Sequence, residues 1–572
     1  MDISIRIGGA AGQGVQTISS IIARTFVRHD FYVFVNQDFE SRIRGGHNFD
    51  QVRISNTPVR AVSDQIHILI ALDEETTRQD IDCLAENGVL LFDGETIGFK
   101  SDDPNHLSVP FARIAAEAGK SKIMINAVAT GAVTALLDFK LQPVLDVMQE
   151  QFQKRGAETV AKNQKCATAG YEYVRQAWNK KPSFRVPSAQ MSRQKMLLTG
   201  SQAMAIGAMA SGLKFYSGYP MSPATTIMEF VSSQADKYNI ILEQAEDEIA
   251  AINMVIGASF AGARAMTATS GGGFCLMVEA LSLAGTTETP AVIVVAQRPG
   301  PSTGLPTRTE QADLNLVIHA GHGDFPRAIL APGSPEQALS LMSKAFNLAD
   351  KYQTPVIVLG DQHFGDAYFT VDELDLGGIT IDRGHILTIQ DLPSPLEYKR
   401  YALSESGISP RILPGQTKAV LYADSDEHTE EGHITESATV RNQMMRKRMQ
   451  KLEGMVREID PPEIYPAGEA EVVLLGWGST HGVLKETVDK LNQNGIGTQM
   501  LHYCELFPIN HRHLATAGLR KSKIIAVENN FTGQFADLFS NATGLSVDQR
   551  ILKYDGRPFT SGEIVDRIKD MI

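Results

Sequence analysis

The sequence contains few cysteines, and this scarcity limits the chemistry that the chain can perform alone. Among its 572 residues there are four, Cys83, Cys166, Cys275 and Cys504, and no two are spaced like a local metal-binding pair. Because iron–sulfur clusters and Cys-rich zinc sites are held by closely spaced cysteines, neither is expected in this chain. So few cysteines in a long chain also favour a reducing compartment.

Long apolar runs and an excess of positive charge are missing too. No stretch approaches 18 consecutive apolar residues, so a membrane-spanning helix is not expected. The N-terminus has no basic segment leading into an apolar core, so the sequence predicts a cytoplasmic protein without a secretory signal. The 66 acidic residues outnumber the 53 Lys and Arg residues, and a net charge of −13 argues against nucleic-acid binding.

Strand-like and helix-like runs alternate along most of the chain, which is typical of βαβ units and parallel sheets. We expect an α/β domain over residues 1–185 and a second over residues 195–370. An irregular connecting segment with a basic helix is expected over residues 371–465, and a third, smaller α/β domain over residues 466–572. The fold class predicted is therefore multidomain α/β.

A glycine-rich turn at residues 8–14 (GGAAGQG) lies between a predicted strand and a predicted helix. Backbone amides and the helix dipole could hold a phosphate group at such a turn. The glycines follow the order G-x-x-G-x-G, which is not the dinucleotide fingerprint G-x-G-x-x-G. A phosphate site and a purely structural tight turn both remain open for this segment.

The run Tyr219-Pro220-Met221-Ser222-Pro223 joins a predicted strand to a predicted helix in the second domain. Pro223 is expected in the first helical turn, with Ser222 as the N-cap. A hydroxyl and free backbone amides at that position would suit a small carboxylate. The alternative is an ordinary Ser-Pro cap with no ligand.

Three further signals follow predicted strands of the same domain. Glu248 opens an almost wholly apolar helix, and carboxylates held against apolar surfaces are typical of acid–base sites, although a solvated helix start is the alternative. The three glycines at residues 271–273 would let a cofactor ring or another backbone come close. Arg298 follows a buried strand and could clamp a carboxylate, or form a structural ion pair.

Two histidines in an acidic loop, His428 and His433, are the remaining candidates for metal ligands. Their spacing matches no standard pattern such as H-E-x-x-H, and acidic loops that carry histidine are usually solvated. The sequence therefore predicts no metal site in this chain.

Together these motifs resemble the alpha chains of the 2-oxoacid:ferredoxin oxidoreductases. The likeness covers nearly the whole chain, and its most specific part is residues 297–307 (QRPGPSTGLPT). The family form of the run at residues 219–223 is Y-P-I-T-P, so Met221 and Ser222 depart from it. The closest type is the fused gamma–alpha chain, which includes the 2-oxoglutarate:ferredoxin oxidoreductases.

The resemblance extends to each predicted domain. The first, with residues 8–14 and Arg44-Gly45-Gly46, resembles the family's gamma domain. The second resembles its pyrimidine-binding domain for thiamine diphosphate. The last resembles its transketolase C-terminal-like domain, and carries Glu528-Asn529-Asn530 and Gly533-Gln534.

The resemblance implies an enzyme that is complete only with a second chain. In the family, thiamine diphosphate lies between two chains, and the beta chain supplies a G-D-G motif for Mg²⁺ and cysteines for a 4Fe–4S cluster. Gly-Asp-Gly occurs nowhere in this sequence, which agrees with that division. The implied partners are a beta subunit, in a dimer of alpha–beta heterodimers, and ferredoxin or flavodoxin, and coenzyme A is the implied co-substrate.

The resemblance also implies residue roles. Glu248 would be the catalytic carboxylate that hydrogen-bonds the aminopyrimidine ring of thiamine, with Tyr219 and Pro220 beside the cofactor. The substrate-binding residues would be Ser222, Arg298 and Thr307. The expected reaction converts 2-oxoglutarate, coenzyme A and oxidised ferredoxin to succinyl-CoA, CO₂ and reduced ferredoxin, and could run in reverse to fix CO₂. Pyruvate or branched-chain 2-oxoacids, a nucleotide-binding dehydrogenase and a non-catalytic scaffold subunit are the alternatives.

Overall fold

The computed structural model describes residues 1–42, 45–178, 184–187, 195–391, 398–416, 418–510, 514 and 519–572. The chain forms two compact units. Unit 1 combines Met1–Leu198 with Ala367–Glu373 and Thr560–Ile572, and unit 2 combines Thr199–Asp366 with Leu374–Phe559. Each unit is thus built from segments that are far apart in the sequence. The finer division into four segments remains a prediction.

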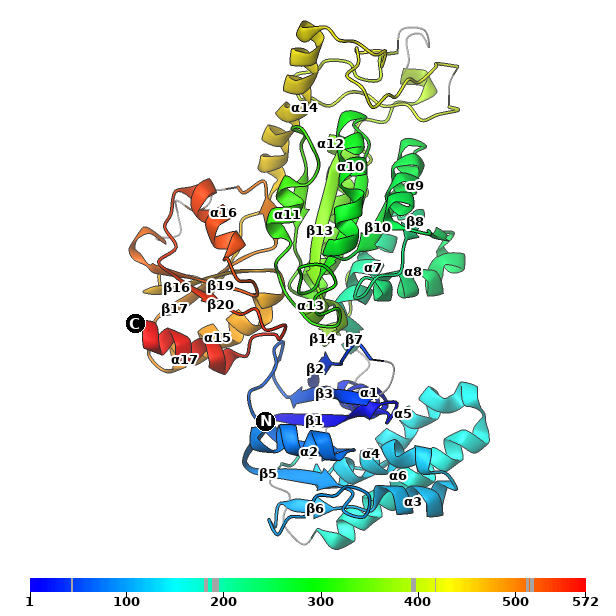
Figure 1. Ribbon diagram of the computed structural model, residues 1–572, viewed down its shortest axis with the longest axis vertical. Helices are drawn as coiled ribbons and strands as arrows, with labels where there is room; N and C mark the ends of the chain where they lie inside the picture. Colours follow the sequence, from blue (N-terminus) through cyan, green and yellow to red (C-terminus); the bar gives the residue numbers. More distant parts are fainter. Residues whose placement is uncertain are drawn as a thin grey trace. The chain divides into compact units, whose positions relative to one another are not determined.

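Unit 1 is organised around a mixed sheet, which has eight strands in the part of the chain described, in the order β6-β5-β4-β1-β3-β2-β14-β7 (Figure 1). Strand β1 pairs in parallel with β4 and antiparallel with β3. Strand β4 (IHILIA) is a nearly continuous apolar run because its residues are buried on both faces. The late strand β14 pairs with β2.

The elements of unit 1 have the following bounds. The helices are α1 (Val15–Val27), α2 (Glu74–Asp80), α3 (Phe111–Gly119), α4 (Ile125–Leu136), α5 (Gln142–Phe152), α6 (Ala157–Ala177) and α17 (Ser561–Met571). The strands are β1 (Asp2–Ala11), β2 (Tyr32–Asp38), β3 (Gly45–Ser55), β4 (Ile66–Ala71), β5 (Leu84–Phe92), β6 (His106–Ser108), β7 (Lys195–Thr199) and β14 (Tyr368–Asp372).

Unit 2 contains two sheets. The larger has the order β18-β12-β13-β11-β10-β8-β9, and the smaller has the order β15-β17-β16-β19-β20, counting the described strands. In the larger sheet the strands from β12 to β9 are parallel, and the central β11 (AVIVVAQ) is buried along its length. One apolar core continues from one sheet to the other, and includes Leu314, Trp477 and Phe535. The two sheets are therefore held together by apolar packing.

The elements of unit 2 have the following bounds. The helices are α7 (Gly200–Ala210), α8 (Thr225–Tyr238), α9 (Glu248–Phe260), α10 (Gly271–Thr286), α11 (Leu314–His319), α12 (Pro335–Tyr352), α13 (Gln362–Asp366), α14 (Ala438–Glu458), α15 (His481–Gln493) and α16 (Gln534–Thr543). The strands are β8 (Phe215–Gly218), β9 (Ile241–Gln244), β10 (Ala265–Thr269), β11 (Ala291–Gln297), β12 (Ala328–Leu330), β13 (Pro355–Asp361), β15 (Glu463–Tyr465), β16 (Val472–Trp477), β17 (Thr498–Tyr503), β18 (Glu505–Phe507), β19 (Lys523–Glu528) and β20 (Gln549–Leu552).

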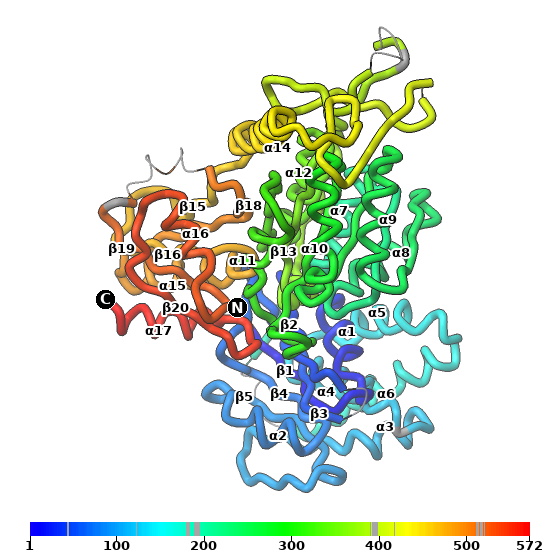
Figure 2. The backbone as a smooth tube through the Cα atoms, turned by 45° about the horizontal axis from the view of Figure 1, so that its top comes forward, coloured from blue at the N-terminus to red at the C-terminus, as the bar shows by residue number. Residues whose placement is uncertain are grey.

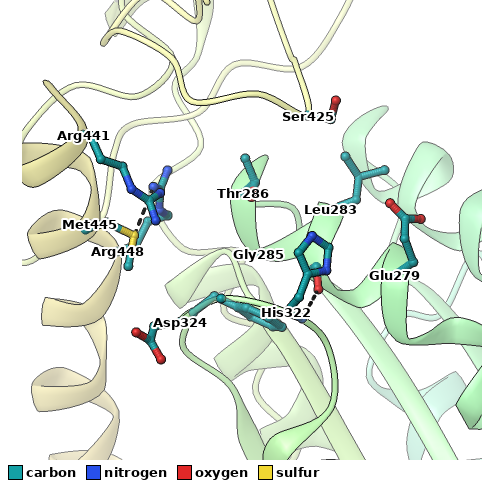
Figure 3. A pocket seen from close by; sticks show the side chains of 13 residues that line it. Glu279, Leu283, Gly285, Thr286, His322, Asp324, Ser425, Arg441, Met445 and Arg448 are labelled. Carbon is teal, nitrogen blue, oxygen red and sulfur yellow. Dashed lines mark hydrogen bonds between the residues drawn. The ribbon is translucent and has the colours of Figure 1, made fainter. Parts of the chain in front are cut away.

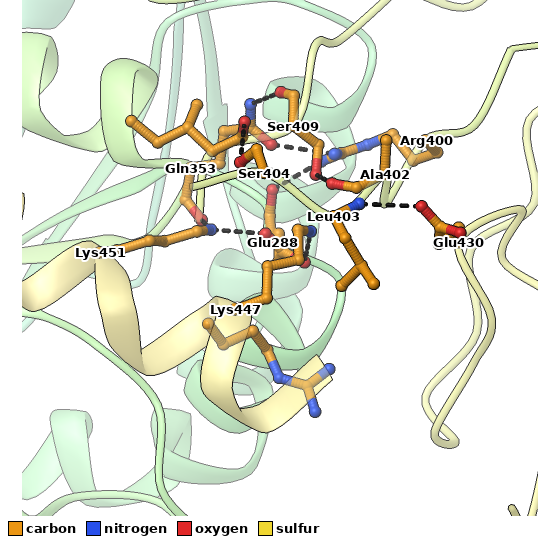
Figure 4. Close-up of polar contacts among 12 residues, drawn as sticks. Glu288, Gln353, Arg400, Ala402, Leu403, Ser404, Ser409, Glu430, Lys447 and Lys451 are labelled. Carbon is orange, nitrogen blue, oxygen red and sulfur yellow. Dashed lines mark hydrogen bonds and ion pairs between the residues drawn. The ribbon is translucent and has the colours of Figure 1, made fainter. Parts of the chain in front are cut away.

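The basic helix expected in the connecting segment is α14, which packs against α12 (Figure 2). It is anchored by a buried ion cluster, in which the carboxylate of Glu288 lies 2.6 Å from the Nζ atoms of both Lys447 and Lys451 (Figure 4). Arg400 donates to the backbone carbonyl of Glu288 at 2.7 Å. Burial acts to raise the pKa of Glu288, but the ammonium groups outweigh it and hold that pKa well below its usual range. Burial lowers the pKa of Lys451 to about 8.

None of the described helices combines the length and the apolar character that crossing a membrane would require.

Candidate active site

The site residues predicted from the sequence gather at the carboxyl ends of the parallel strands of the larger sheet in unit 2. The chain passes from β8 to β9 on one side and then to β10 on the other, so the order of strands reverses between β8 and β10. Open α/β sheets bind ligands in the crevice at such a reversal. The loops that follow β8, β9, β10 and β11 are therefore the expected place for a ligand.

Glu248 is the first residue of α9, where Asp247 caps the helix by accepting a hydrogen bond from the amide of Ala250 at 2.7 Å. Glu248 is 3% exposed. Among the described residues, no group donates a hydrogen bond to its Oε1. A buried acceptor without a donor is costly, because the group has lost its water contacts without replacement. The carboxylate is therefore suited to a ligand that brings an N–H or O–H group.

The glycines at the start of α10 explain why Glu248 can take this position. A Cβ atom on Gly273 would lie 2.6 Å from Glu248 Oε1 and 2.1 Å from the hydroxyl oxygen of Thr269. Any side chain at Gly273 would displace the carboxylate or the strand end. At Gly272, by contrast, a Cβ atom would meet no described atom within 4 Å, so that glycine leaves open space.

The loop after β8 departs from the sequence prediction. Helix α8 begins at Thr225 with Ala224 as its N-cap, so the prediction of Ser222 as the N-cap was wrong. The physical reason is a further turn at residues 222–224 before the helix begins. Tyr219, Pro220 and Ser222 are exposed on this loop.

Arg298 and Ser222 are brought together at this edge of the sheet, because Arg298 Nη1 donates to the carbonyl oxygen of Ser222 at 2.7 Å. Burial lowers the pKa of Arg298, and the nearby Asp313 acts in the opposite direction. Thr307 lies half-buried on the loop that follows Arg298. This loop folds back sharply, since a Cβ atom on Gly304 would lie 1.8 Å from the carbonyl oxygen of Pro299. A guanidinium and a hydroxyl residue at one edge suit a carboxylate ligand.

Two acidic residues at this edge, Asp313 and Glu310, were not predicted from the sequence. Asp313 has a buried Oδ2 atom to which no described group donates, and a Cβ atom on Gly271 would lie 2.4 Å from it. Burial raises the pKa of Asp313 to about 6, against the effect of Arg298. Burial and the charge of Asp313 raise the pKa of Glu310 to about 7. Their only sequence signal was position, a few residues after the motif at 297–307.

In unit 1, the glycine-rich segment at residues 8–14 favours the structural interpretation. Gly8 and Gly9 belong to strand β1, and a Cβ atom on Gly8 would lie 2.3 Å from Thr76. The side chain of Gln13 fills the turn, accepting from the amide of Ala10 at 2.6 Å. The adjacent pocket, of about 340 Å³, is lined by the carboxylates of Asp73, Glu74 and Asp93, which would repel a phosphate. Arg44 of the neighbouring motif lies outside the described residues.

Another pocket, of about 380 Å³, lies in unit 2 (Figure 3). It is lined by Thr286 at the far end of α10, about 22 Å along the helix from Gly271 at a rise of 1.5 Å per residue. Its two arginines, Arg441 and Arg448, are both paired with Glu427. This pocket is separate from the candidate active site.

Comparison with known proteins finds two matching families and several similar chains. A family described as pyruvate flavodoxin/ferredoxin oxidoreductase, thiamine diphosphate-binding, matches residues 206–447, and the pyruvate ferredoxin/flavodoxin oxidoreductase family matches residues 4–173. A 2-oxoacid:ferredoxin oxidoreductase alpha subunit of Sulfolobus is 34% identical over 100% of this chain and 97% of its own. The 2-oxoglutarate oxidoreductase subunit KorA of Mycobacterium tuberculosis is 26% identical over 98% of this chain and 90% of its own.

A solved structure is similar over the full length. The 2-oxoglutarate:ferredoxin oxidoreductase of Magnetococcus marinus, with 2-oxoglutarate, coenzyme A and succinyl-CoA bound, is 33% identical. It aligns with a TM-score of 0.93 over 100% of this chain and 99% of its own. The similarity to this structure therefore includes residues of both units.

Proposed function

This chain belongs to the 2-oxoacid:ferredoxin oxidoreductases as an alpha-type subunit, and on that premise we propose that it acts on 2-oxoglutarate. The proposed reaction converts 2-oxoglutarate, coenzyme A and oxidised ferredoxin to succinyl-CoA, CO₂ and reduced ferredoxin. The observation that carries the proposal is the buried Glu248 carboxylate, with its unpartnered Oε1 atom beside the glycines of α10. The ligands of the Magnetococcus marinus structure support the choice of substrate.

The residues around Glu248 fit the pyrimidine end of thiamine diphosphate. Glu248 would accept a hydrogen bond through Oε1 and pass a proton to and from the ring, and the exposed Tyr219 and Pro220 would border the cofactor. When bound, thiamine diphosphate supplies the electron sink that loss of CO₂ from a 2-oxoacid requires. Gly273 keeps the carboxylate in place because no side chain there competes for its position.

The substrate end of the proposed site lies at Arg298. Its guanidinium would pair with the carboxylate of the 2-oxoacid, and its hydrogen bond to the carbonyl of Ser222 orients it toward the loop after β8. The hydroxyls of Ser222 and Thr307 would donate to the same substrate. Ser222 retains the hydroxyl of the family threonine and lacks only its methyl group.

The other half of the site would come from a beta subunit that carries Mg²⁺ and a 4Fe–4S cluster. An exposed apolar surface beside Glu248 supports this partner, since Ile249 on α9 and Leu276 on α10 are each 50% exposed. On the same helices, a Cβ atom added at Gly257 or Gly272 would have no described atom within 4 Å. We propose a dimer of such alpha–beta pairs in the cytoplasm, which passes electrons to ferredoxin or flavodoxin.

The direct test is to co-express the chain with the beta subunit and to follow reduction of a redox dye. With coenzyme A present, 2-oxoglutarate should give a higher kcat/KM than pyruvate or 2-oxoisovalerate, and the isolated alpha chain should be inactive. A preference for pyruvate would overturn the substrate assignment. Full activity of the isolated chain would overturn the proposal that the active site is shared between two chains.

Changing Leu276 to aspartate should weaken binding of the beta subunit without unfolding the alpha chain. Because the side chain is half exposed, the charge should cost little in the free chain, whereas burying it in an interface should cost about 2 kcal/mol or more, roughly thirtyfold in Kd. Titration calorimetry would measure this. The control Ile123→Asp, on an exposed isoleucine of unit 1, should leave Kd unchanged, and equal weakening by both variants would contradict the assigned surface.

A further inference from the structure

The smaller sheet of unit 2 has its own reversal of strand order. The chain passes from β16 to β17 on one side, whereas β19 is followed by β20 on the other, so the crevice lies at the carboxyl ends of β16 and β19. Sheets of this kind bind ligands at this position. Here the crevice holds Gln311, which lies between β11 and α11 and is 0% exposed.

Gln311 uses all of its polar groups in the crevice. Its side-chain amide donates to the carbonyl of Trp477 at 2.9 Å and accepts from the amide of Asn529 at 3.1 Å. Its backbone amide donates to the carbonyl of Asn529 at 2.7 Å, and its backbone carbonyl accepts from Asn530 Nδ2 at 3.1 Å. Gln311 is therefore bound as a ligand would be, by four directed hydrogen bonds.

Gln534 extends the contact to the residues that follow Gln311. Its Nε2 atom donates to the carbonyl of Ala312 at 2.8 Å, and its Oε1 atom accepts from the amide of Asn315 at 2.8 Å. The two hydrogen bonds are made to residues that lie on either side of Asp313 in the chain. Gln534 thus sets the backbone position of the segment that carries that carboxylate.

Further hydrogen bonds within the Glu-Asn-Asn and Gly-Gln motifs hold the side chain of Asn530 and the start of α16 in place. Asn530 donates from the same Nδ2 to Glu528 at 2.9 Å, and its Oδ1 accepts from the amide of Gly533 at 2.7 Å. Glu528 also accepts from Trp477 Nε1 at 3.2 Å and from the amide of Phe535 at 2.9 Å. The motif is a single hydrogen-bonded assembly directed at residues 311–315.

The segment held in this way is part of the candidate active site. It follows Thr307 in the chain, and the amide of Asp313 donates to Gln297 Oε1 at 3.0 Å, next to Arg298. Apolar packing already joins the two sheets, but such packing is not directional. Hydrogen bonds are directional, so they determine the register in which the segment lies against Arg298.

We propose that Gln311, Asn530 and Gln534 are positioning residues for the 2-oxoacid site. The smaller sheet uses its ligand crevice to bind residues 311–315 of its own chain, and thereby places Asp313 near Arg298. The identity of the substrate rests on the proposed function, but the positioning role applies to whichever 2-oxoacid the complex uses.

The test is Gln534→Ala in the complex of alpha and beta subunits. Loss of its two hydrogen bonds should free the segment and raise the KM for the 2-oxoacid about tenfold, with a smaller change in kcat and no change in the KM for coenzyme A. Gln493→Ala, on an exposed glutamine of α15, is the matched control and should behave as wild type. If Gln534→Ala fails to assemble, Gln534→Glu keeps the acceptor for the amide of Asn315 but turns a carboxylate oxygen toward the carbonyl oxygen of Ala312, and it should also raise the KM for the 2-oxoacid.

Tryptophan fluorescence gives a readout that a general loss of stability would not mimic. The sequence contains two tryptophans, Trp178 and Trp477, so Trp178→Phe leaves Trp477 as the reporter inside the hydrogen-bonded assembly. Binding of the 2-oxoacid should change its emission, and Gln534→Ala should abolish that change. An unchanged KM and an unchanged emission response in Gln534→Ala would overturn the inference. A wild-type preference for another 2-oxoacid would overturn only the proposed substrate, since both measurements can be made with that acid.

Discussion

Replacing Glu248 by glutamine is expected to lower kcat of the alpha–beta complex by about 10²- to 10⁴-fold, the range for loss of a proton-transfer group. Glutamine has the same size as glutamate and retains an acceptor oxygen, so it fits beside Gly273, but its amide cannot exchange a proton. The alpha chain should keep its thermal stability, because the carboxylate has an oxygen without a donor among the described residues. Dye reduction with saturating 2-oxoacid would measure the loss.

The matched control for this change is Glu246→Gln. Glu246 lies two positions before Glu248 and is exposed, so the same chemical substitution should leave kcat unchanged. Binding of thiamine diphosphate, followed by quenching of protein fluorescence, should be retained at least in part by both variants. Full activity of Glu248→Gln would show that the acid–base role belongs to another residue, with Asp313 and Glu310 as the next candidates because burial raises their pKa values.

Replacing Glu288 by glutamine is expected to have the largest effect on stability. The carboxylate is fully buried between Lys447 and Lys451, with Arg400 bound to its backbone carbonyl, so its loss leaves buried positive charges without a counter-charge. Removing one partner of a buried ion pair costs about 3 to 5 kcal/mol. Urea unfolding of the alpha chain, followed by circular dichroism, would measure the decrease in the free energy of unfolding.

A compensating variant separates charge from packing in this prediction. The triple change Glu288→Gln, Lys447→Met and Lys451→Met removes both signs of charge, and should recover much of the lost stability because apolar groups often replace buried ion pairs without loss. Glu279→Gln, on an exposed position of α10, should stay within about 0.5 kcal/mol of wild type. A single Glu288→Gln variant as stable as wild type would show that α14 is held by packing alone.

Much of the candidate site could be predicted from the sequence because its signals are local. The apolar run of β11 predicted a buried strand, and the strand is buried throughout. The acidic residues before an apolar helix predicted a helix start near Glu248, and α9 begins there. Arg298 was expected after the end of a strand, and it directly follows β11. In each case the residues that determine the feature are neighbours in the chain.

The features that were wrongly predicted, or not predicted, depend on contacts between residues that are distant in the sequence. Ser222 was wrongly predicted as a helix cap because the turn at residues 222–224 has no distinctive local pattern. Asp313 escaped notice because its burial depends on Gly271, from another strand end. The short strand β14 and the terminal helix α17 belong to unit 1, although most of that unit comes from the first 198 residues of the chain.

By itself, the sequence determined the family of this protein and its α/β class, and it pointed to the residues that we propose carry its chemistry, since these follow from local periodicity and from motifs of a few residues. Only the tertiary structure decided how those residues are held. The hydrogen bonds from Asn529, Asn530 and Gln534 to residues 311–315 join positions more than 200 residues apart. Hydrogen bonding acts over about 3 Å in space whatever the separation along the chain, so such contacts become visible only when the chain has folded.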